Sequence, residues 1–523
     1  MALKRVGFGA VLLAAVVAVT ACGTTTSATT GGSGNEPSEI TIAAVSPPLS
    51  LDPAKNSNTA ESQEYMDLAY EPLIKLEPDG SLGPGLASSW KYLDNSQTTF
   101  QLNLRSNAKF SDGSPVTAKQ VVASLNHEKS AGGPVAVYVN TIKSATATGP
   151  HMVELKLIRP NPTIAFILTQ RFLIGDIVGP KGTKNPESLG TTTDGAGPYM
   201  LDPSQTVAGD HYTFVPNPHY FEPKAVHFKK FTVRVIENPQ ATLSALQSGQ
   251  VAFAKGSPQL AEAAKSRDLN VTSALSSWYG AFILDRDGEV DPALASPLVR
   301  QALNYATDRK GITQTIFGSS EFGKPTSEPT VAGYENEGYV PELEDHYPYD
   351  PSKAKELLAK AGYGNGFTVT IGASEAFGEG VQVAQALASD WGKVGVKVDI
   401  KQYPSIEAIL PPWSEKKLPI VIGGYDAQPM YIFSEQALAP TAGLFNIWEA
   451  SEPKLTSLIE KGYAATRPAQ QGAAWAAVTK QVVELGWFVP YAAGATVYFS
   501  VSGLEGVEIS PVAFGQNPNL LHY

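Results

Sequence analysis

The sequence contains one cysteine, Cys22, so no disulfide within the chain can stabilise its fold. The 523 residues exceed one ordinary core of about 100–200 residues. With 43% hydrophobic and 17% charged residues, the composition is typical of a globular protein rather than a disordered one. The chain is therefore expected to form a large globular structure without disulfides.

The first 22 residues have the pattern of a secretory signal. Lys4 and Arg5 precede the apolar run Val6–Val19, and small residues lead from that run to Cys22. The alternative is a retained membrane helix, but the run has 14 residues and a spanning helix needs about 20. Residues 1–21 are therefore expected to be a signal peptide.

Cys22 is the predicted site of lipidation. Val19–Cys22 resembles the bacterial lipobox, in which the cysteine becomes the lipidated first residue of the mature protein. The alternative is a free thiol, which would be a liability on an exported chain. The stretch 23–38 is almost all Gly, Ser and Thr, as in a flexible tether. Residues 22–38 are thus expected to anchor the protein to the outer face of the cytoplasmic membrane.

The formal charge of −11 argues against nucleic acid as a partner. No basic stripe runs along the sequence, and such a stripe is the electrostatic footprint of nucleic-acid binding. An acidic surface aids solubility and says little about a small ligand.

Hydrophobic periodicity predicts a mixed α/β protein without internal repeats. The segment 367–400 is predicted to form a strand, a helix and a strand, which is an element of a parallel sheet. Thr117 and Asp350 are predicted helix N-caps. Further strands are expected at 40–45, 100–104, 153–157, 419–422 and 497–501, and further helices at 64–74, 297–306, 455–463 and 471–485.

Motifs for catalysis and metal binding are weak. Residues 318–324 match the start of a phosphate-binding loop, but Pro325 stands where a hydroxyl must hold Mg²⁺. His211, His219 and His227 recur every eight residues, whereas tight metal sites use spacings of about two to five. No Gly-x-Ser-x-Gly elbow and no cysteine nucleophile occurs in the body of the chain. No catalytic residue, metal or cofactor is therefore predicted.

A series of motifs resembles the family 5 extracellular solute-binding proteins, whose best-known members bind dipeptides, oligopeptides or nickel complexes for ABC importers. The motifs appear in chain order from about residue 40 onward. They are Leu51–Pro53, the pair Tyr70–Leu73 and Leu86–Trp90, Phe110–Val121, the pair Gly195–Tyr199 and Asn217–Phe221, Val299–Arg309, and Tyr349–Ala354. Arg300 in the fifth motif is expected to anchor its helix by an ion pair.

The resemblance implies a two-lobed, periplasmic-binding-protein-like fold with mixed sheets, an extra domain and a ligand cleft between the lobes. Hinge bending of the lobes would exclude water and fix a closed shape for the importer to read. The expected divisions are a discontinuous lobe I at 39–57, 190–285 and 487–523, an extra domain at 58–189, and the opposite lobe at 286–486.

The implied function is capture of a peptide or peptide-like solute for ABC permease subunits, and the chain is expected to be a monomer. One alternative within the family is a non-peptide ligand, such as a metal chelate, an oligosaccharide or an organic acid. An alternative of another class is a secreted hydrolase of peptides or carbohydrates, and the missing nucleophile and metal motifs argue against it.

Six residues are predicted to bind the ligand. In peptide-binding members of the family an aspartate after the strand that corresponds to 419–422 accepts hydrogen bonds from the ligand's ammonium group, and the resemblance implies this role for Asp426. The chemistry favours it, because a buried ammonium needs a compensating carboxylate. The others are Tyr425, Trp278 and Tyr279 as aromatic lining, Arg171 for an anionic ligand group, and Asn446. The structural alternatives are core packing for the aromatic residues, a surface ion pair for Arg171 and a turn for Asp426.

Two segments depart from the family pattern. Ala252 follows Gly249–Val251 where the family usually has an acidic residue, and Gly423–Pro429 lacks the tryptophan and one acid of the usual pocket segment. The fold assignment survives both changes, and both changes bear on the nature of the ligand.

Overall fold

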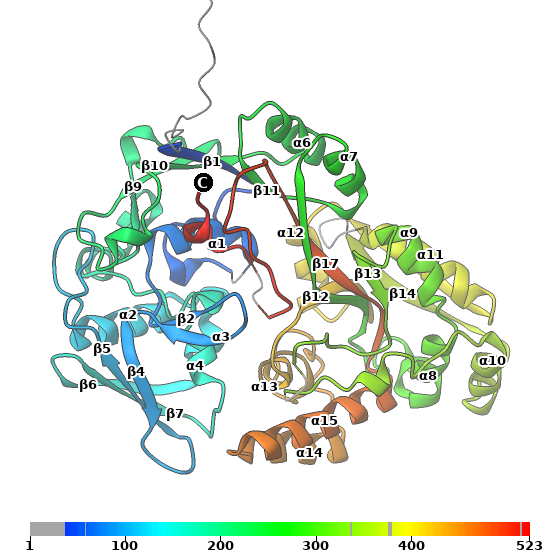
Figure 1. The fold of residues 1–523 in the computed structure, drawn as a ribbon. Helices are drawn as coiled ribbons and strands as arrows, with labels where there is room; N and C mark the ends of the chain where they lie inside the picture. Colours follow the sequence, from blue (N-terminus) through cyan, green and yellow to red (C-terminus); the bar gives the residue numbers. More distant parts are fainter. Residues whose placement is uncertain (1–36, 58, 335–336, 375–378, 513–514) are drawn as a thin grey trace, which may run out of the picture. The chain divides into compact units, whose positions relative to one another are not determined.

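A mixed sheet of eleven strands forms the centre of the computed structural model, which describes residues 37–57, 59–334, 337–374, 379–512 and 515–523 (Figure 1). Over these residues the strand order is β15-β14-β16-β12-β17-β11-β1-β10-β9-β8, and β13 pairs with β17. The strands are β1 (Glu39–Ala44), β8 (Tyr199–Leu201), β9 (His211–Pro216), β10 (Lys230–Val235), β11 (Phe253–Lys255), β12 (Asn270–Ile283), β13 (Gly323–Pro325), β14 (Phe367–Ser374), β15 (Val396–Tyr403), β16 (Ile420–Asp426) and β17 (Phe488–Ser500).

The predicted strand–helix–strand unit lies at one edge of this sheet. β14 and β15 pair in parallel, from Phe367 opposite Val396 to Ser374 opposite Tyr403. The connecting helix, α11 (Gly380–Gly392), buries Val383, Leu387 and Trp391. Alternating apolar residues in the strands and an apolar stripe on the helix form this unit, so the prediction for 367–400 is confirmed.

Two long antiparallel strands, β12 and β17, join the two ends of the sheet and run side by side in Figure 1. β12 also pairs with β16, and β17 also pairs with β11. The sequence prediction missed β12 and found only the end of β17. These two strands are the covalent and hydrogen-bonded bridge between the β1–β11 half and the β14–β16 half.

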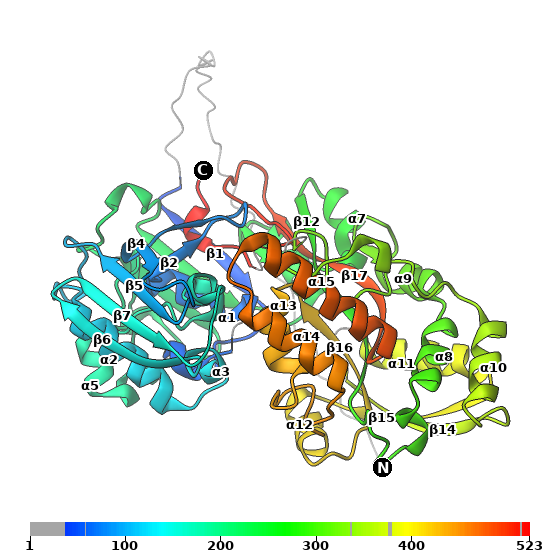
Figure 2. The same cartoon turned by 90° about the horizontal axis from the view of Figure 1, so that it is seen from below.

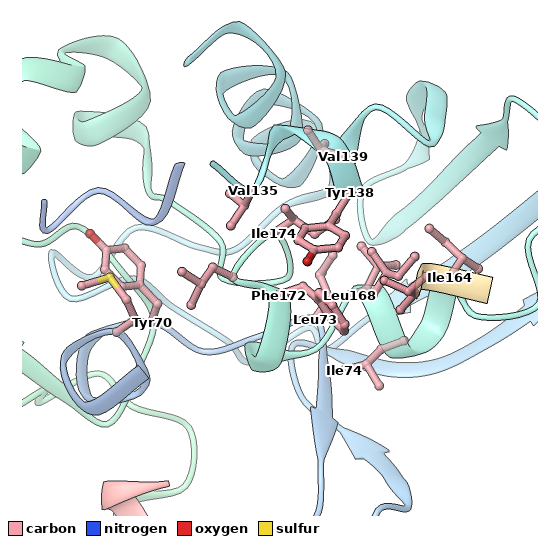
Figure 3. Packing of buried hydrophobic residues seen from close by; sticks show 14 of the residues in the cluster. Tyr70, Leu73, Ile74, Val135, Tyr138, Val139, Ile164, Leu168, Phe172 and Ile174 are labelled. Carbon is pink, nitrogen blue, oxygen red and sulfur yellow. The ribbon is translucent and has the colours of Figure 1, made fainter. Parts of the chain in front are cut away.

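Residues 59–189 contain a second sheet, and their buried apolar residues belong to one cluster with those of the large sheet. Its strands are β4 (Ala87–Tyr92), β5 (Thr99–Leu104), β6 (Ile142–Gly149) and β7 (Met152–Leu157), in the order β4-β5-β7-β6, and the pair β2 (Ile74–Leu76) and β3 (Leu82–Pro84) lies beside it. Figure 3 shows Tyr138, Phe172, Leu168 and Ile174 packed together in this part of the chain. The rings of Tyr138 and Phe172 meet edge to face with centroids 4.6 Å apart.

Helices cover the sheets. Of these, α14 and α15 lie side by side (Figure 2). Tyr463 of α14 packs on Trp475 of α15, with ring centroids 5.6 Å apart. The helices other than α11 are α1 (Ala60–Ala69), α2 (Ala118–Ala131), α3 (Ala136–Val139), α4 (Ile164–Ile167), α5 (Pro180–Lys184), α6 (Pro239–Gln247), α7 (Ala261–Lys265), α8 (Pro297–Tyr305), α9 (Arg309–Phe317), α10 (Pro351–Lys360), α12 (Ile406–Ser414), α13 (Met430–Phe433), α14 (Pro453–Ala464) and α15 (Pro468–Leu485).

Local capping chemistry fixes several helix starts. Thr117 accepts a hydrogen bond from the Gln120 amide and Asp350 from the Lys353 amide, so both predicted N-caps are confirmed. The helix expected at 64–74 is instead α1 at 60–69. The helix ends at Ala69, which agrees with the presence of Pro72, because a proline disfavours helical backbone at the residue before it.

Arg300 anchors α8, but through backbone carbonyls. Its guanidinium donates to the carbonyl oxygens of Leu485, Arg286, Leu294 and Ala295 at 2.5–3.3 Å. A planar group with five donors suits several carbonyls at once, so these bonds replace the predicted ion pair.

The predicted signal peptide, Cys22 and most of the tether lie outside the described residues. Among the helices of the described part, none is long and apolar enough to cross a membrane. Residues 37–523 group as one unit by their contacts, so the borders predicted for the lobes stay predictions.

Candidate functional site: a cavity beside the long central strands

A cavity of about 310 Å³ lies where β11, β12, β16 and β17 meet residues from both halves of the sheet. One side comes from Thr59–Glu61 and Lys255–Gln259, and the other from Ile316, Phe317 and Asp426. Ser277, Tyr279 and Thr496 on the long strands form its floor. Segments distant in sequence thus converge on one partly open cavity, as in a ligand-binding cleft.

Strand pairing decides which predicted residues reach this cavity. Ser277 is opposite Asp426 and Trp278 is opposite Tyr425 in the antiparallel pair of β12 and β16. Neighbouring residues of a strand point to opposite faces of the sheet. Asp426 and Tyr279 therefore line the cavity, and Tyr425 and Trp278 face the other way.

Asp426 is the last residue of β16 and is half-buried on the cavity wall. The Ser277 hydroxyl donates to its Oδ1 at 2.8 Å. Burial raises the pKa of the Asp426 carboxyl, and the charge of Arg171 and the Ser277 hydrogen bond oppose that rise. A carboxylate that is costly to bury and faces a cavity is stabilised by a cation entering it.

Tyr279 forms an aromatic wall with Phe317 and Tyr491, at centroid distances of 5.8 and 6.5 Å. Glycines on the two neighbouring strands make room for its ring. A Cβ atom at Gly424 would lie 2.6 Å from the ring, and one at Gly494 would lie 2.5 Å from it. Side chains at these two positions would therefore displace Tyr279 from the wall.

An ion pair lies on one side of the same cavity. Lys255 at the end of β11 lies 2.6 Å from Glu61 of α1. The Glu61 carboxylate raises the pKa of Lys255, and the Lys255 ammonium lowers the pKa of Glu61. Both groups are consequently charged at neutral pH, and the lysine charge is already compensated.

Gln259 links the two sides of the cavity. Its side-chain amide donates to the carbonyl of Ile316 at 3.0 Å and to the Glu379 carboxylate at 2.8 Å. These bonds connect the β1–β11 half to the β14–β16 half, so the two walls are in contact in this structure.

Tyr425 and Trp278 belong to an aromatic core behind the sheet. Trp278 is 0% exposed and stacks on Phe282 at 4.8 Å, and Tyr425 packs on Phe433 at 4.7 Å. The Tyr425 hydroxyl donates to the Gln436 side-chain oxygen. Neither ring lines this cavity, because strand alternation turns both away from Asp426, and their contact with the ligand stays a prediction.

Arg171 and Asn446 also lie away from the cavity wall. Arg171 is buried, donates to the carbonyl of Ala427 at 2.8 Å, and lines a second cavity of about 270 Å³. Asn446 is 0% exposed and binds backbone groups of Ala439 and Ala450. Its side chain therefore fixes a loop, and that of Arg171 links residues 58–189 to the strand end beside Asp426.

The sequence analysis missed Glu61, Lys255, Ser277 and Gln259 as wall residues. Glu61 and Lys255 are 194 positions apart, so no local pattern connects them. Ser277 is adjacent to the predicted Trp278. Had the sequence analysis predicted strand β12, the alternation of its side chains would have indicated Ser277 and Tyr279 as wall residues in place of Trp278. Within the described part of the chain, no group of three or more His, Cys, Asp or Glu residues is arranged to hold a metal ion.

Solved structures with the same fold are two-lobed binding proteins. AgaA in complex with agropinic acid, from A. tumefacien R10, has a TM-score of 0.79 and 22% identity, covering 92% of this chain and 98% of that one. DppA from Helicobacter pylori in complex with the peptide STSA has a TM-score of 0.78 and 21% identity, covering 93% and 98%. The predicted fold class, a two-lobed α/β binding protein with mixed sheets, is confirmed.

The chain belongs to the bacterial extracellular solute-binding proteins, family 5, whose profile ("family 5 Middle") matches residues 81–440. It is also 28% identical over 365 residues to the glutathione-binding protein GsiB of Escherichia coli O6:K15:H31, a match that covers 69% of each protein. The predicted role as a solute-binding protein of an ABC importer is thereby confirmed.

Proposed function

We propose that the protein captures a short peptide or peptide-like solute in the cavity beside β12 and β17. The observation that carries this proposal is Asp426, a half-buried carboxylate on the cavity wall that accepts a hydrogen bond from Ser277. A ligand ammonium there would gain a charge-assisted hydrogen bond and would compensate a carboxylate that burial disfavours. The named ligands of GsiB and DppA, glutathione and a peptide, support the same class.

Cavity size supports a short ligand. A volume of about 310 Å³ lies at the lower end of the roughly 300–1,000 Å³ that small-molecule sites span. That space suits a ligand of on the order of ten to twenty non-hydrogen atoms, which is the size of a dipeptide or a small tripeptide. Tyr279, Phe317 and Tyr491 supply apolar surface for its side chains.

The chain acts, in this proposal, as an exported lipoprotein without enzymatic activity. Cys22 carries the lipid, residues 22–38 tether the folded part to the outer face of the cytoplasmic membrane, and permease subunits receive the loaded protein. The signal-like residues 1–21 and the absence of a nucleophile motif from the sequence support these assignments. Arg171 positions the Ala427 carbonyl beside Asp426, and Tyr425 and Trp278 support that wall from the core.

Calorimetry with a set of di- and tripeptides, including Ala-Gln and glutathione, tests the proposal. Binding of at least one peptide without its cleavage, followed by chromatography of the recovered ligand, is the expected result. Recovery of cleaved peptide would assign the protein to the hydrolases. Failure of every peptide to bind would move the ligand to the non-peptide class, for which AgaA with agropinic acid offers a first probe.

A further inference from the structure

The charges on the cavity wall are unbalanced. Four of the described lining residues are acids or bases, and three of them are carboxylic acids. They are Glu61, Glu379, Asp426 and the single cation Lys255. The formal charge of this wall is therefore −2.

Lys255 cannot attract a ligand carboxylate without losing an existing partner. Its ammonium lies 2.6 Å from Glu61, and both groups belong to the cavity wall. A ligand carboxylate arriving at Lys255 would also meet the negative charge of Glu61. The pair thus presents a nearly neutral surface, and the excess charge of the wall stays negative.

Arg171 is a further cation whose field reaches Asp426. It lines the neighbouring cavity, is buried, and donates to the Ala427 carbonyl. Its effect on the ionisation of Asp426 is smaller than the opposing effect of burial. Including Arg171 leaves the surroundings of the ligand with an excess of negative charge.

Aromatic faces give the cavity a second preference for cations. Tyr279, Phe317 and Tyr491 line the cavity together with the carboxylates. The face of an aromatic ring attracts a cation through its quadrupole, and this attraction grows when water is excluded. A ligand ammonium or guanidinium group would therefore find both carboxylates and rings.

We propose that the cleft selects short peptides with a net positive charge over neutral and acidic peptides. This inference rests on the proposed function and adds the class of peptide. Glutathione has two carboxylates and one ammonium group, so it has the opposite charge. The wall thus predicts a ligand different from that named for the relative GsiB.

Three dipeptides that differ in charge, Ala-Lys, Ala-Gln and Ala-Glu, test the selection by calorimetry at low ionic strength. We expect wild-type protein to bind Ala-Lys at least tenfold more tightly than Ala-Glu, with Ala-Gln between them. Equal or tighter binding of Ala-Glu would overturn the inference and leave the peptide function intact. If none of the three dipeptides bound and other peptides also failed to bind, both the proposed function and this inference would be wrong.

Glu61→Gln is the informative variant, because it leaves the Lys255 charge without its partner. The ratio of Ala-Lys to Ala-Glu affinity should then fall at least fivefold. Glu262→Gln is a matched control on the surface helix α7, where Glu262 pairs with Lys265 at 3.2 Å, and it should leave the ratio unchanged. If Glu61→Gln left the Ala-Lys to Ala-Glu affinity ratio at its wild-type value, at unchanged melting temperature, the result would contradict the assignment of charge to this wall.

Discussion

Replacing Trp278 by phenylalanine should change neither peptide affinity nor stability by much, although Trp278 lies next to two wall residues. Its ring is 0% exposed and packs on Phe282, Phe488 and Phe433 at centroid distances of 4.8, 5.5 and 6.1 Å. Phenylalanine keeps an aromatic ring in this cluster. Affinity for a peptide should therefore stay within about twofold of wild type, because the neighbouring Ser277 and Tyr279 keep their places.

The stability change follows from two opposing effects. The smaller ring removes three non-hydrogen atoms from a packed site, which costs about 2–3 kcal/mol. The indole Nε1 has no hydrogen-bond partner among the described residues, and removing such a buried donor returns about 1–3 kcal/mol. The net effect of Trp278→Phe therefore lies between a gain of about 1 and a loss of about 2 kcal/mol, whereas Trp278→Ala should cost about 3–5 kcal/mol.

Thermal unfolding and calorimetry on both variants check this reasoning. A tenfold or larger loss of peptide affinity in Trp278→Phe, at unchanged melting temperature, would show that Trp278 contacts the ligand. That result would refute its placement in the core behind the sheet.

Three further predictions concern the pH response, the core and the anchor. Burial raises the pKa of the Glu328 carboxyl to about 8. The stability that this shift contributes is complete below about pH 4 and is lost as the pH rises through 8. Glu328→Gln should therefore flatten the fall in melting temperature between pH 5 and 9, and parallel melting curves for variant and wild type over this range would contradict the prediction. Arg300→Met leaves buried carbonyls without donors and should cost at least about 3 kcal/mol in unfolding experiments, whereas the exposed Arg234→Met should stay within about 0.5 kcal/mol. Cys22→Ala should release the protein from the membrane fraction, and equal detergent dependence of both forms would exclude Cys22 as the anchor.

Local sequence patterns predicted the parts of the fold that local physics determines. The unit 367–400 follows from alternation in two strands, an apolar helix stripe and the Asp350 cap of the preceding helix. The predicted strand 419–422 was expected to end at Gly423 and Gly424. Both glycines instead continue β16, because they pair with Gly280 and Tyr279 of β12.

The candidate site could be predicted only where one residue carried the chemistry. Asp426 was predicted from its resemblance to the aspartate that follows this strand in peptide-binding members of the family, and it lines a cavity wall in the structure. The side toward which Trp278 and Tyr425 point depends on pairing between β12 and β16, about 150 residues apart. The Glu61–Lys255 pair likewise forms only in the folded chain.

Asp426→Asn measured against a free-amine peptide and its N-acetylated form tests the central claim most directly. Asparagine keeps the shape of the side chain and removes its charge, and loss of one partner of a desolvated charge pair typically costs about 2–5 kcal/mol, or roughly thirtyfold or more in affinity. Asp399→Asn, an exposed change on β15, is the matched control.

Calorimetry should show Asp426→Asn losing at least thirtyfold in affinity for Ala-Gln, with Asp399→Asn unchanged. N-acetyl-Ala-Gln should bind wild type and Asp426→Asn with equal, weak affinity, because it has no ammonium group for the carboxylate. Equal affinity of wild type and Asp426→Asn for the free-amine peptide would contradict the account and remove Asp426 from the ligand site.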